Sequence, residues 1–161
     1  MSQVIKVGMA DLKVTGPPEV LSTLGLGSCI GICLYDPVTK VSGLAHIMLP
    51  NSQTIRNNSN RAKFADTAID DMIDEMIKKG ANKRRLVGKI AGGAQMFSFS
   101  SKNDMMKIGA RNADAVRSIL KDMGIPLKAD DTGGNFGRTI EFYPEDGRLL
   151  IKTIGHGTKT V

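Results

Sequence analysis

The chain has little of the residues that hold small proteins together through covalent or metal bonds. Its 161 residues include two cysteines, two histidines and no tryptophan. Cys29 and Cys33 lie in one apolar stretch, and four residues of extended chain span about 13 Å. That separation is too long for a disulfide or for two ligands of one zinc ion. The sequence therefore predicts no disulfide and no metal site.

Long apolar runs are also missing. No stretch approaches the roughly 20 residues that cross a bilayer, and no charged segment precedes an apolar leader at the N-terminus. Two unpaired thiols suit a reducing compartment, and a chain with 41% hydrophobic residues can bury one core. We expect a single cytoplasmic domain over residues 1–161 without membrane insertion. Its core runs from about 4 to 154, and 155–161 form a mobile tail.

A hairpin is the clearest local pattern. Apolar residues alternate over 30–35, Asp36-Pro37 gives a turn signal, and a second apolar run begins at Val41. This pattern predicts two antiparallel strands. A turn over 37–40 pairs Asp36 with Val41, and the same register continues back along the hairpin to Cys29.

This register places a cysteine and a histidine on one face. Cys29 faces Met48, and His46 is its diagonal neighbour, about 7 Å away on the same face. A shift of two residues would place Cys29 and His46 directly opposite each other, whereas a shift of one residue would place them on opposite faces. A thiol beside an imidazole indicates covalent acyl chemistry, with a thiol pKa below the roughly 8.5 of free cysteine.

Cys29 is the better nucleophile of the two thiols. It follows Gly27 and Ser28, small residues that let a substrate approach the backbone. Cys33 lies between an isoleucine and a leucine, where a small buried apolar side chain is the ordinary interpretation. The same interpretation is the alternative for Cys29.

Histidine is as scarce as cysteine. His156 lies in a polar C-terminal stretch, where a frayed tail is the default expectation. His46 lies in the apolar strand, and a core histidine with one backbone hydrogen bond is the alternative to a catalytic role. No Asp, Asn or Glu lies close to it in the hairpin strands to fix its tautomer. Thr23, at the end of the preceding predicted strand, has a hydroxyl that can accept this hydrogen bond.

The remaining pattern predicts an α+β fold. Apolar residues recur at helical spacing over 61–79 and 112–123. Runs of strands with only two long helices favour layered mixed β-sheets, a sandwich-like core flanked by the helices, over a doubly wound fold. Outside the hairpin, strands are expected at 4–9, 19–24, 86–91, 126–130, 138–143 and 148–154.

Two glycine-rich stretches and one basic cluster have simpler interpretations. The stretch 25–31 imitates a dinucleotide fingerprint, but a strand follows where a helix should begin, so no cofactor is expected. The stretch 133–138 is either a phosphate cradle or, more commonly, a turn. The net charge is +6, with a cluster of lysines and arginines at 78–85. This cluster is either a solvated helix end or a surface for an acidic protein; no aromatic side chain interleaves with it for nucleic-acid binding.

Several segments together carry a resemblance to a known family. Thr23-Leu-Gly-Leu-Gly-Ser-Cys29, followed by 33–37 and 43–50, resembles the signature of the CheD family of chemoreceptor glutamine deamidases. Segments 92–97, 108–112 and 131–138 fit the same family in order and spacing, so the match extends from about Val7 to Lys152.

The resemblance implies an activity and a set of site residues. It implies a Cys-His-Thr triad of Cys29, His46 and Thr23 that converts glutamine to glutamate on methyl-accepting chemotaxis receptors through a thioester, without a cofactor. The same machinery would hydrolyse a glutamyl methyl ester. Kinship with toxin-type cysteine deamidases is implied as well. Substrate contacts are expected from Gly27, Ser28, Gly133, Gly134, Asn135 and Phe136.

Two alternative functions remain at this point. CheD-like proteins resemble partners of CheC-type phosphatases, which makes a regulatory binding module in chemotaxis adaptation the main alternative. A cysteine peptidase would use the same nucleophile with a different leaving group. Release of ammonia or of new amino termini distinguishes these two reactions.

Overall fold

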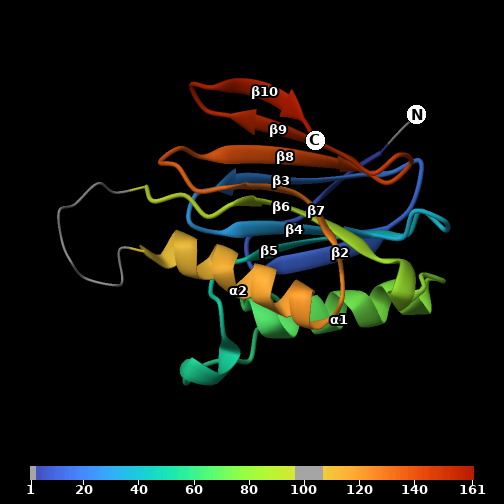
Figure 1. Ribbon diagram of the computed structural model, residues 1–161, viewed down its shortest axis with the longest axis horizontal. Helices are drawn as coiled ribbons and strands as arrows, with labels where there is room; N and C mark the ends of the chain where they lie inside the picture. Colours follow the sequence, from blue (N-terminus) through green and yellow to red (C-terminus); the bar gives the residue numbers. More distant parts are fainter. Residues whose placement is uncertain (1–2, 97–106) are drawn as a thin grey trace.

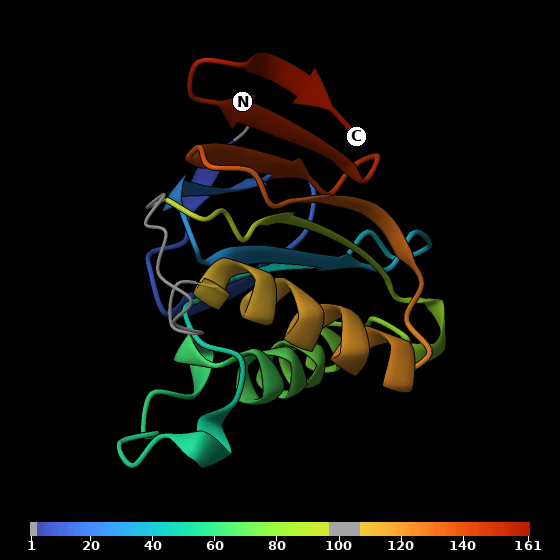
Figure 2. The same cartoon turned by 60° about the vertical axis from the view of Figure 1, so that its left-hand side comes forward.

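Two β-sheets and a pair of helices form three layers. The computed structural model describes residues 3–96 and 107–161. The first sheet has the strand order β1-β3-β8-β9-β10, the second has the order β2-β5-β4-β6-β7, and both helices lie on the side of the second sheet away from the first (Figures 1 and 2). The strands are β1 (Val4–Lys6), β2 (Asp11–Thr15), β3 (Val20–Leu26), β4 (Ile30–Tyr35), β5 (Ser42–Ile47), β6 (Val87–Gly92), β7 (Leu127–Thr132), β8 (Arg138–Tyr143), β9 (Arg148–Thr153) and β10 (Gly157–Thr160).

Each face of the second sheet contributes to a separate core. On one face, Ile30, Ile32 and Leu34 pack against the helices. On the other face, Cys33 and Leu44 pack against the first sheet. Because side chains alternate along a strand, the apolar run of β4 is buried on both faces. The parallel pairs β1–β3 and β6–β7, among otherwise antiparallel neighbours, make both sheets mixed, which agrees with the α+β prediction.

The predicted hairpin has the predicted register. Ile30 pairs with Ile47 and Gly31 with His46, so the next step along the hairpin brings Cys29 to the level of Met48. A Cβ added to Gly31 would lie 2.6 Å from Cδ1 of Ile140 in β8, so this face of the hairpin looks toward the first sheet. His46 shares that face because cross-strand partners point the same way.

Both predicted helices form, with shifted starts. Helix α1 (Ala65–Lys78) buries its apolar stripe against the second sheet. A short 3-10 turn at Arg61–Lys63, capped by the side chain of Asn60, precedes it. Helix α2 (Ile108–Asp122) begins four residues before the predicted range. Its first turn carries Gly109, which packs tightly against the backbone of Gly93 and Ala94.

Two edge strands differ from the sequence prediction. The expected strand at 4–9 ends at Lys6, and a separate strand, β2, pairs with β5. The segment 155–161, expected as a mobile tail, contains β10, which pairs antiparallel with β9. All four residues of β10 are exposed. Its pairing therefore depends on backbone hydrogen bonds and on the ion pair of Lys159 with Asp131, neither of which leaves an apolar pattern in the sequence.

Candidate active site

The three candidate residues come from three strands at one end of the sandwich. Thr23 lies in the middle of β3, His46 is the next-to-last residue of β5, and Cys29 lies directly before β4. All three side chains are buried; Thr23 is 2%, His46 1% and Cys29 7% exposed. Thr23 belongs to the first sheet and the other two to the second, so the site lies between the sheets.

A hydrogen bond joins Thr23 to His46 across the two sheets. The Thr23 hydroxyl donates its proton to the carbonyl oxygen of Val7 at 2.7 Å, and its oxygen lies 2.7 Å from Nδ1 of His46. A hydroxyl has one proton to donate. Nδ1 must therefore carry the proton of the imidazole and donate it to Thr23. Nε2 is left as the unprotonated nitrogen, buried and without a hydrogen-bond partner within the described residues.

Burial sets the charge of the site at rest. It raises the pKa of Cys29, with an opposing effect from the residue's own N–H, and it lowers the pKa of His46. Both shifts favour the neutral form of each group. The expectation of a lowered thiol pKa is therefore wrong, because the hairpin register predicts the neighbouring imidazole but not the loss of water around the pair.

The second cysteine is fully buried and unsuited to the same role. Cys33 faces the core between the sheets, and burial raises its pKa, against the attraction of the nearby Lys89 ammonium. No substrate can reach a side chain with no exposed area. This arrangement agrees with the structural interpretation of Cys33.

Backbone groups hold the chain on both sides of Cys29. The N–H of Gly93 donates to the Cys29 carbonyl at 2.9 Å, and the N–H of Ala94 donates to the Gly27 carbonyl at 2.9 Å. Gly92 has φ +117°, and a Cβ there would lie 2.2 Å from the Cys29 carbonyl oxygen. The N–H of Cys29 itself donates to no other backbone group within the described residues. It is thus a candidate donor for an oxyanion.

Asn112 is a functional candidate that the sequence analysis did not identify. Its buried Nδ2 donates to the carbonyl of Ser28 at 2.9 Å and to the carbonyl of Met48 at 3.0 Å. The side chain therefore ties helix α2 to both strand ends that carry the site. Gly109, one turn earlier, packs so closely that a Cβ would lie 2.6 Å from the Gly93 carbonyl carbon. Both residues belong to the 108–112 segment noted for its family resemblance.

The loop between β7 and β8 lies at the same end of the sandwich. Gly133 donates its N–H to the Gly92 carbonyl at 3.0 Å, and the guanidinium of Arg138 donates to the carbonyls of Gly92 and Gly133 at 3.1 and 3.0 Å. The guanidinium carbon of Arg138 lies 4.6 Å from the centroid of the Phe136 ring, and the centroid of the His156 ring lies 4.4 Å from it. Gly133, Gly134, Asn135 and Phe136 are thus brought toward the site, and their role in substrate binding stays a prediction.

The basic cluster lies at the opposite end. Asp36 lies at the other end of β4 from Cys29. Its carboxylate accepts hydrogen bonds from the guanidinium of Arg85, at 2.8 Å, and from the backbone N–H of Asn82, at 2.9 Å. These contacts hold residues 83–85 near the β4–β5 turn. Six residues of strand separate this turn from the site, about 20 Å of extended chain.

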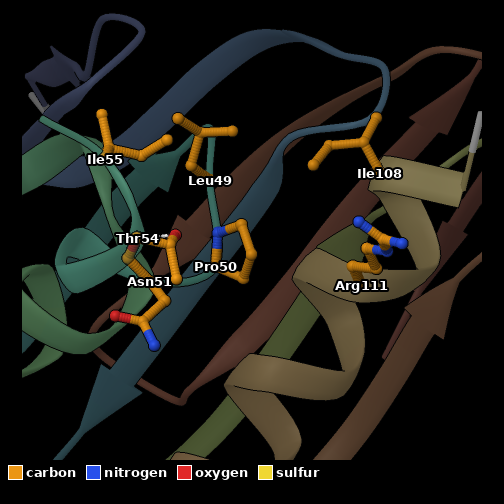
Figure 3. Close-up of a pocket in the computed structure, with 7 residues that line it drawn as sticks. All are labelled: Leu49, Pro50, Asn51, Thr54, Ile55, Ile108 and Arg111. Carbon is orange, nitrogen blue, oxygen red and sulfur yellow. Dashed lines mark hydrogen bonds between the residues drawn. The ribbon is translucent and has the colours of Figure 1, made fainter. Parts of the chain in front are cut away.

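Two surface cavities flank the site without including Cys29 in their walls. One, of about 400 Å³, lies between the chain after β5 and the start of α2 (Figure 3), and is lined by Leu49, Pro50, Asn51, Thr54, Ile55, Ile108 and Arg111. The other, of about 300 Å³, is lined by Lys6, Val7, Gly8, Met9, Ser22, Thr23 and Leu24. The second cavity brings solvent-accessible space to the Thr23 side of the site.

Residues 3–96 and 107–161 contain no group of three or more His, Cys, Asp or Glu side chains placed to hold a metal ion. Neither helix of the described chain is long and apolar enough to span a bilayer.

Comparison with known proteins agrees on one family. The family model described as CheD chemotactic sensory transduction matches residues 48–153. The "Probable chemoreceptor glutamine deamidase CheD" of Caldanaerobacter subterraneus is 62% identical over 160 residues, which is 99% of each chain. The "Chemoreceptor glutamine deamidase CheD" of Halalkalibacterium halodurans is 54% identical over 162 residues, covering 100% of both chains.

A solved structure supports the fold. Protein NMB0706 of Neisseria meningitidis superposes with a TM-score of 0.52 at 12% identity, covering 91% of this chain and 72% of that chain. At this identity the likeness concerns the fold alone. Because the family model and the full-length relatives agree, the chain belongs to the CheD family.

Proposed function

We propose that the protein is a chemoreceptor glutamine deamidase, which converts glutamine side chains of receptors to glutamate. Its relatives carry that name over the full length of the chain. The observation that carries the chemistry is the hydrogen bond between Thr23 and His46, because it fixes the tautomer that leaves Nε2 of His46 as a base on the face shared with Cys29.

Acylation begins from the neutral pair. Nε2 of His46 takes the proton of the Cys29 thiol while the sulfur attacks the amide carbon of the substrate. The carbonyl oxygen becomes an oxyanion, for which the N–H of Cys29 is one donor. His46 then returns the proton to the nitrogen, ammonia leaves, and a thioester joins the substrate to Cys29.

Deacylation uses the same groups in reverse. His46 takes a proton from water as the water attacks the thioester, and the thiol leaves with that proton. The product is a glutamate side chain. With a glutamyl methyl ester as substrate, methanol leaves in place of ammonia and the later steps are the same.

Thr23 is a positioning residue in this scheme. Its hydroxyl touches no reacting atom, but its bond to Nδ1 keeps the ring in one tautomer and stabilises the imidazolium that forms during turnover. Binding of a CheC-type phosphatase, a cytoplasmic location and kinship with toxin deamidases stay predictions from the family resemblance.

Mass spectrometry of a treated receptor tests the proposal. The protein is incubated with a purified receptor cytoplasmic fragment, and each modified site is identified by the mass gain of an amide-to-acid conversion. Wild type and Cys33→Ala should modify the fragment and release ammonia, whereas Cys29→Ala should do neither. Conversion by Cys29→Ala, or new amino termini in place of ammonia, would contradict the proposal.

A further inference from the structure

Exposed apolar side chains gather at the end of the sandwich that holds Cys29. Of the large apolar side chains that are exposed among the described residues, Met9, Leu24, Met96 and Ile154 lie at this end. We call these four side chains the apolar rim. They come from four separate segments of chain, so their gathering is a property of the fold and not of one apolar stretch.

A β-bulge directs Leu24 to the surface. Thr23 pairs with Ile140 and Leu26 with Arg138, so two residues of β3, Leu24 and Gly25, have no partner in β8. Such a bulge re-aims side chains. Leu24 is consequently 61% exposed directly beside the buried Thr23. Met9 shares the cavity that Thr23 and Leu24 line.

Met96 and Ile154 extend the rim on the other sides. The Met96 side chain covers Gly27, where an added Cβ would lie 3.2 Å from its Cγ. Ile154 is 76% exposed, and its N–H donates to the carbonyl of Gly137, at the end of the β7–β8 loop. Protein surfaces rarely leave several large apolar side chains around a functional site without a partner.

We propose that the apolar rim docks the receptor segment that carries the target glutamine, so that apolar receptor side chains flank this glutamine. The inference rests on the proposed function. Cys29 is 7% exposed and lies at the same end of the sandwich as the rim, so a receptor segment that brings a glutamine to Cys29 there would also contact the rim. Burial of apolar area then supplies binding energy that a free glutamine cannot use.

The positions of the charged side chains favour the apolar rim over the basic cluster as the docking surface. Lysines and arginines around 83–85 lie at the far end of β4, where Arg85 pairs with Asp36. At the rim, Lys6 lines the cavity beside Thr23, and Arg138 is buried and paired with Asp131. Binding should therefore depend weakly on ionic strength, because salt screens charge pairs and not apolar contacts.

Binding measurements with rim variants test the inference. Leu24→Ser and Met96→Ser are each placed in a Cys29→Ala background, which separates binding from turnover. Affinity for a purified receptor cytoplasmic fragment is measured by calorimetry at low and high salt. Each rim variant should weaken binding about tenfold, or roughly 1.4 kcal/mol, at both salt concentrations.

Val38→Ser is the matched control. Val38 is 68% exposed in the β4–β5 turn at the opposite end, so its substitution should leave affinity unchanged. A second control uses rim variants that keep Cys29. The rate at which iodoacetamide alkylates Cys29 is measured without receptor, and it should equal the wild-type rate. Wild-type affinity in both rim variants, or an equal loss in Val38→Ser, would overturn the inference.

The proposed function can fail separately from the rim. Rim-dependent binding without any deamidation by the active protein would contradict the deamidase proposal and support the docking surface. Deamidation with full affinity in both rim variants would contradict the docking surface alone.

Discussion

The hydroxyl of Thr23, on one sheet, holds the ring of His46, on the other, through a contact of 2.7 Å. The orientation of the imidazole thus depends on how the two sheets pack. Because the Thr23 proton goes to the carbonyl of Val7, the residue that follows β1 also takes part in choosing the tautomer.

Loss of the Thr23 hydroxyl should slow turnover without abolishing it. Thr23→Val keeps the shape of the side chain but leaves the Nδ1 proton of His46 without an acceptor. We expect kcat to fall by about one to two orders of magnitude, the range found for hydrogen-bond partners that orient metal-ligating histidines. Thr23→Ser retains the hydroxyl and should stay close to wild type. Steady-state kinetics on a receptor fragment compares the two; full activity in Thr23→Val would exclude a positioning role.

The reactivity of Cys29 should rise only at alkaline pH. Burial raises the pKa of its thiol and lowers the pKa of His46, so the two groups form a neutral pair near pH 7. The rate of iodoacetamide alkylation, measured against pH in Cys33→Ala, should follow a thiol pKa above that of free cysteine. A plateau of reactivity below pH 7 would instead indicate a thiolate-imidazolium pair at rest.

His46 should make folding stability depend on pH. Its pKa in the folded protein lies below the 6.5 of a free imidazole because burial disfavours the charged ring. Between these two pKa values the unfolded chain binds more protons, so the free energy of unfolding falls as pH decreases below about 6.5. Chemical denaturation at pH 7.5 and pH 5.5 measures the loss, which should shrink in His46→Gln. The pKa of Asp36 is lowered in the folded protein, so this residue reduces the free energy of unfolding only at pH values below the ordinary pKa of a carboxyl group.

Removal of the Asn112 amide should affect both stability and turnover. Asn112→Ala leaves the carbonyls of Ser28 and Met48 without their donor, at a cost of about 1–3 kcal/mol for a buried group left unpaired. The strand ends that carry Cys29 and His46 lose a shared anchor, so kcat should fall as well. Thermal unfolding and deamidation rate report the two effects.

Asn58→Ala is a matched control for this variant. The amide of the exposed Asn58 also donates to a backbone carbonyl, that of Ser52 at 3.0 Å, but within the loop that follows β5 and not to the strand ends at Ser28 and Met48. Little change in either measurement is expected. Equal losses in the two variants would show that the Asn112 bonds have no special relation to the site.

Local patterns in the sequence predicted the hairpin and both helices correctly. The register of β4 and β5 follows from one turn signal and alternating apolar residues, and the structure confirms it. The strand β10 was missed because all of its residues are exposed, and its pairing needs no apolar pattern. The strand β2 was missed although its Leu12 and Val14 pack against the helix-side core, because two apolar residues are too short a pattern to separate it from the strand expected at 4–9.

The surroundings of the candidate site were less accessible to sequence reasoning. Asn112 is far from Ser28 and Met48 along the chain, and only tertiary packing brings them together. The desolvation that raises the Cys29 pKa likewise depends on the first sheet covering the second. The basic cluster lies far from the site because β4 runs from the site to the turn that the cluster contacts. The position of the cluster in the sequence does not reveal this separation.

The tight backbone packing around Cys29 affects how a mutational scan of this protein would be interpreted. Gly92, Gly93 and Gly109 face backbone atoms at distances where a methyl group has no room. Substitutions at these glycines should be tolerated as poorly as those at the nucleophile, although none of the three supplies a reacting side chain. Gly8, where an added Cβ meets nothing within 4 Å, should accept alanine. A map of intolerant positions would therefore include both the catalytic residues and the glycines that support the backbone around Cys29. Only measurements that separate folding from turnover would distinguish these two classes of residues.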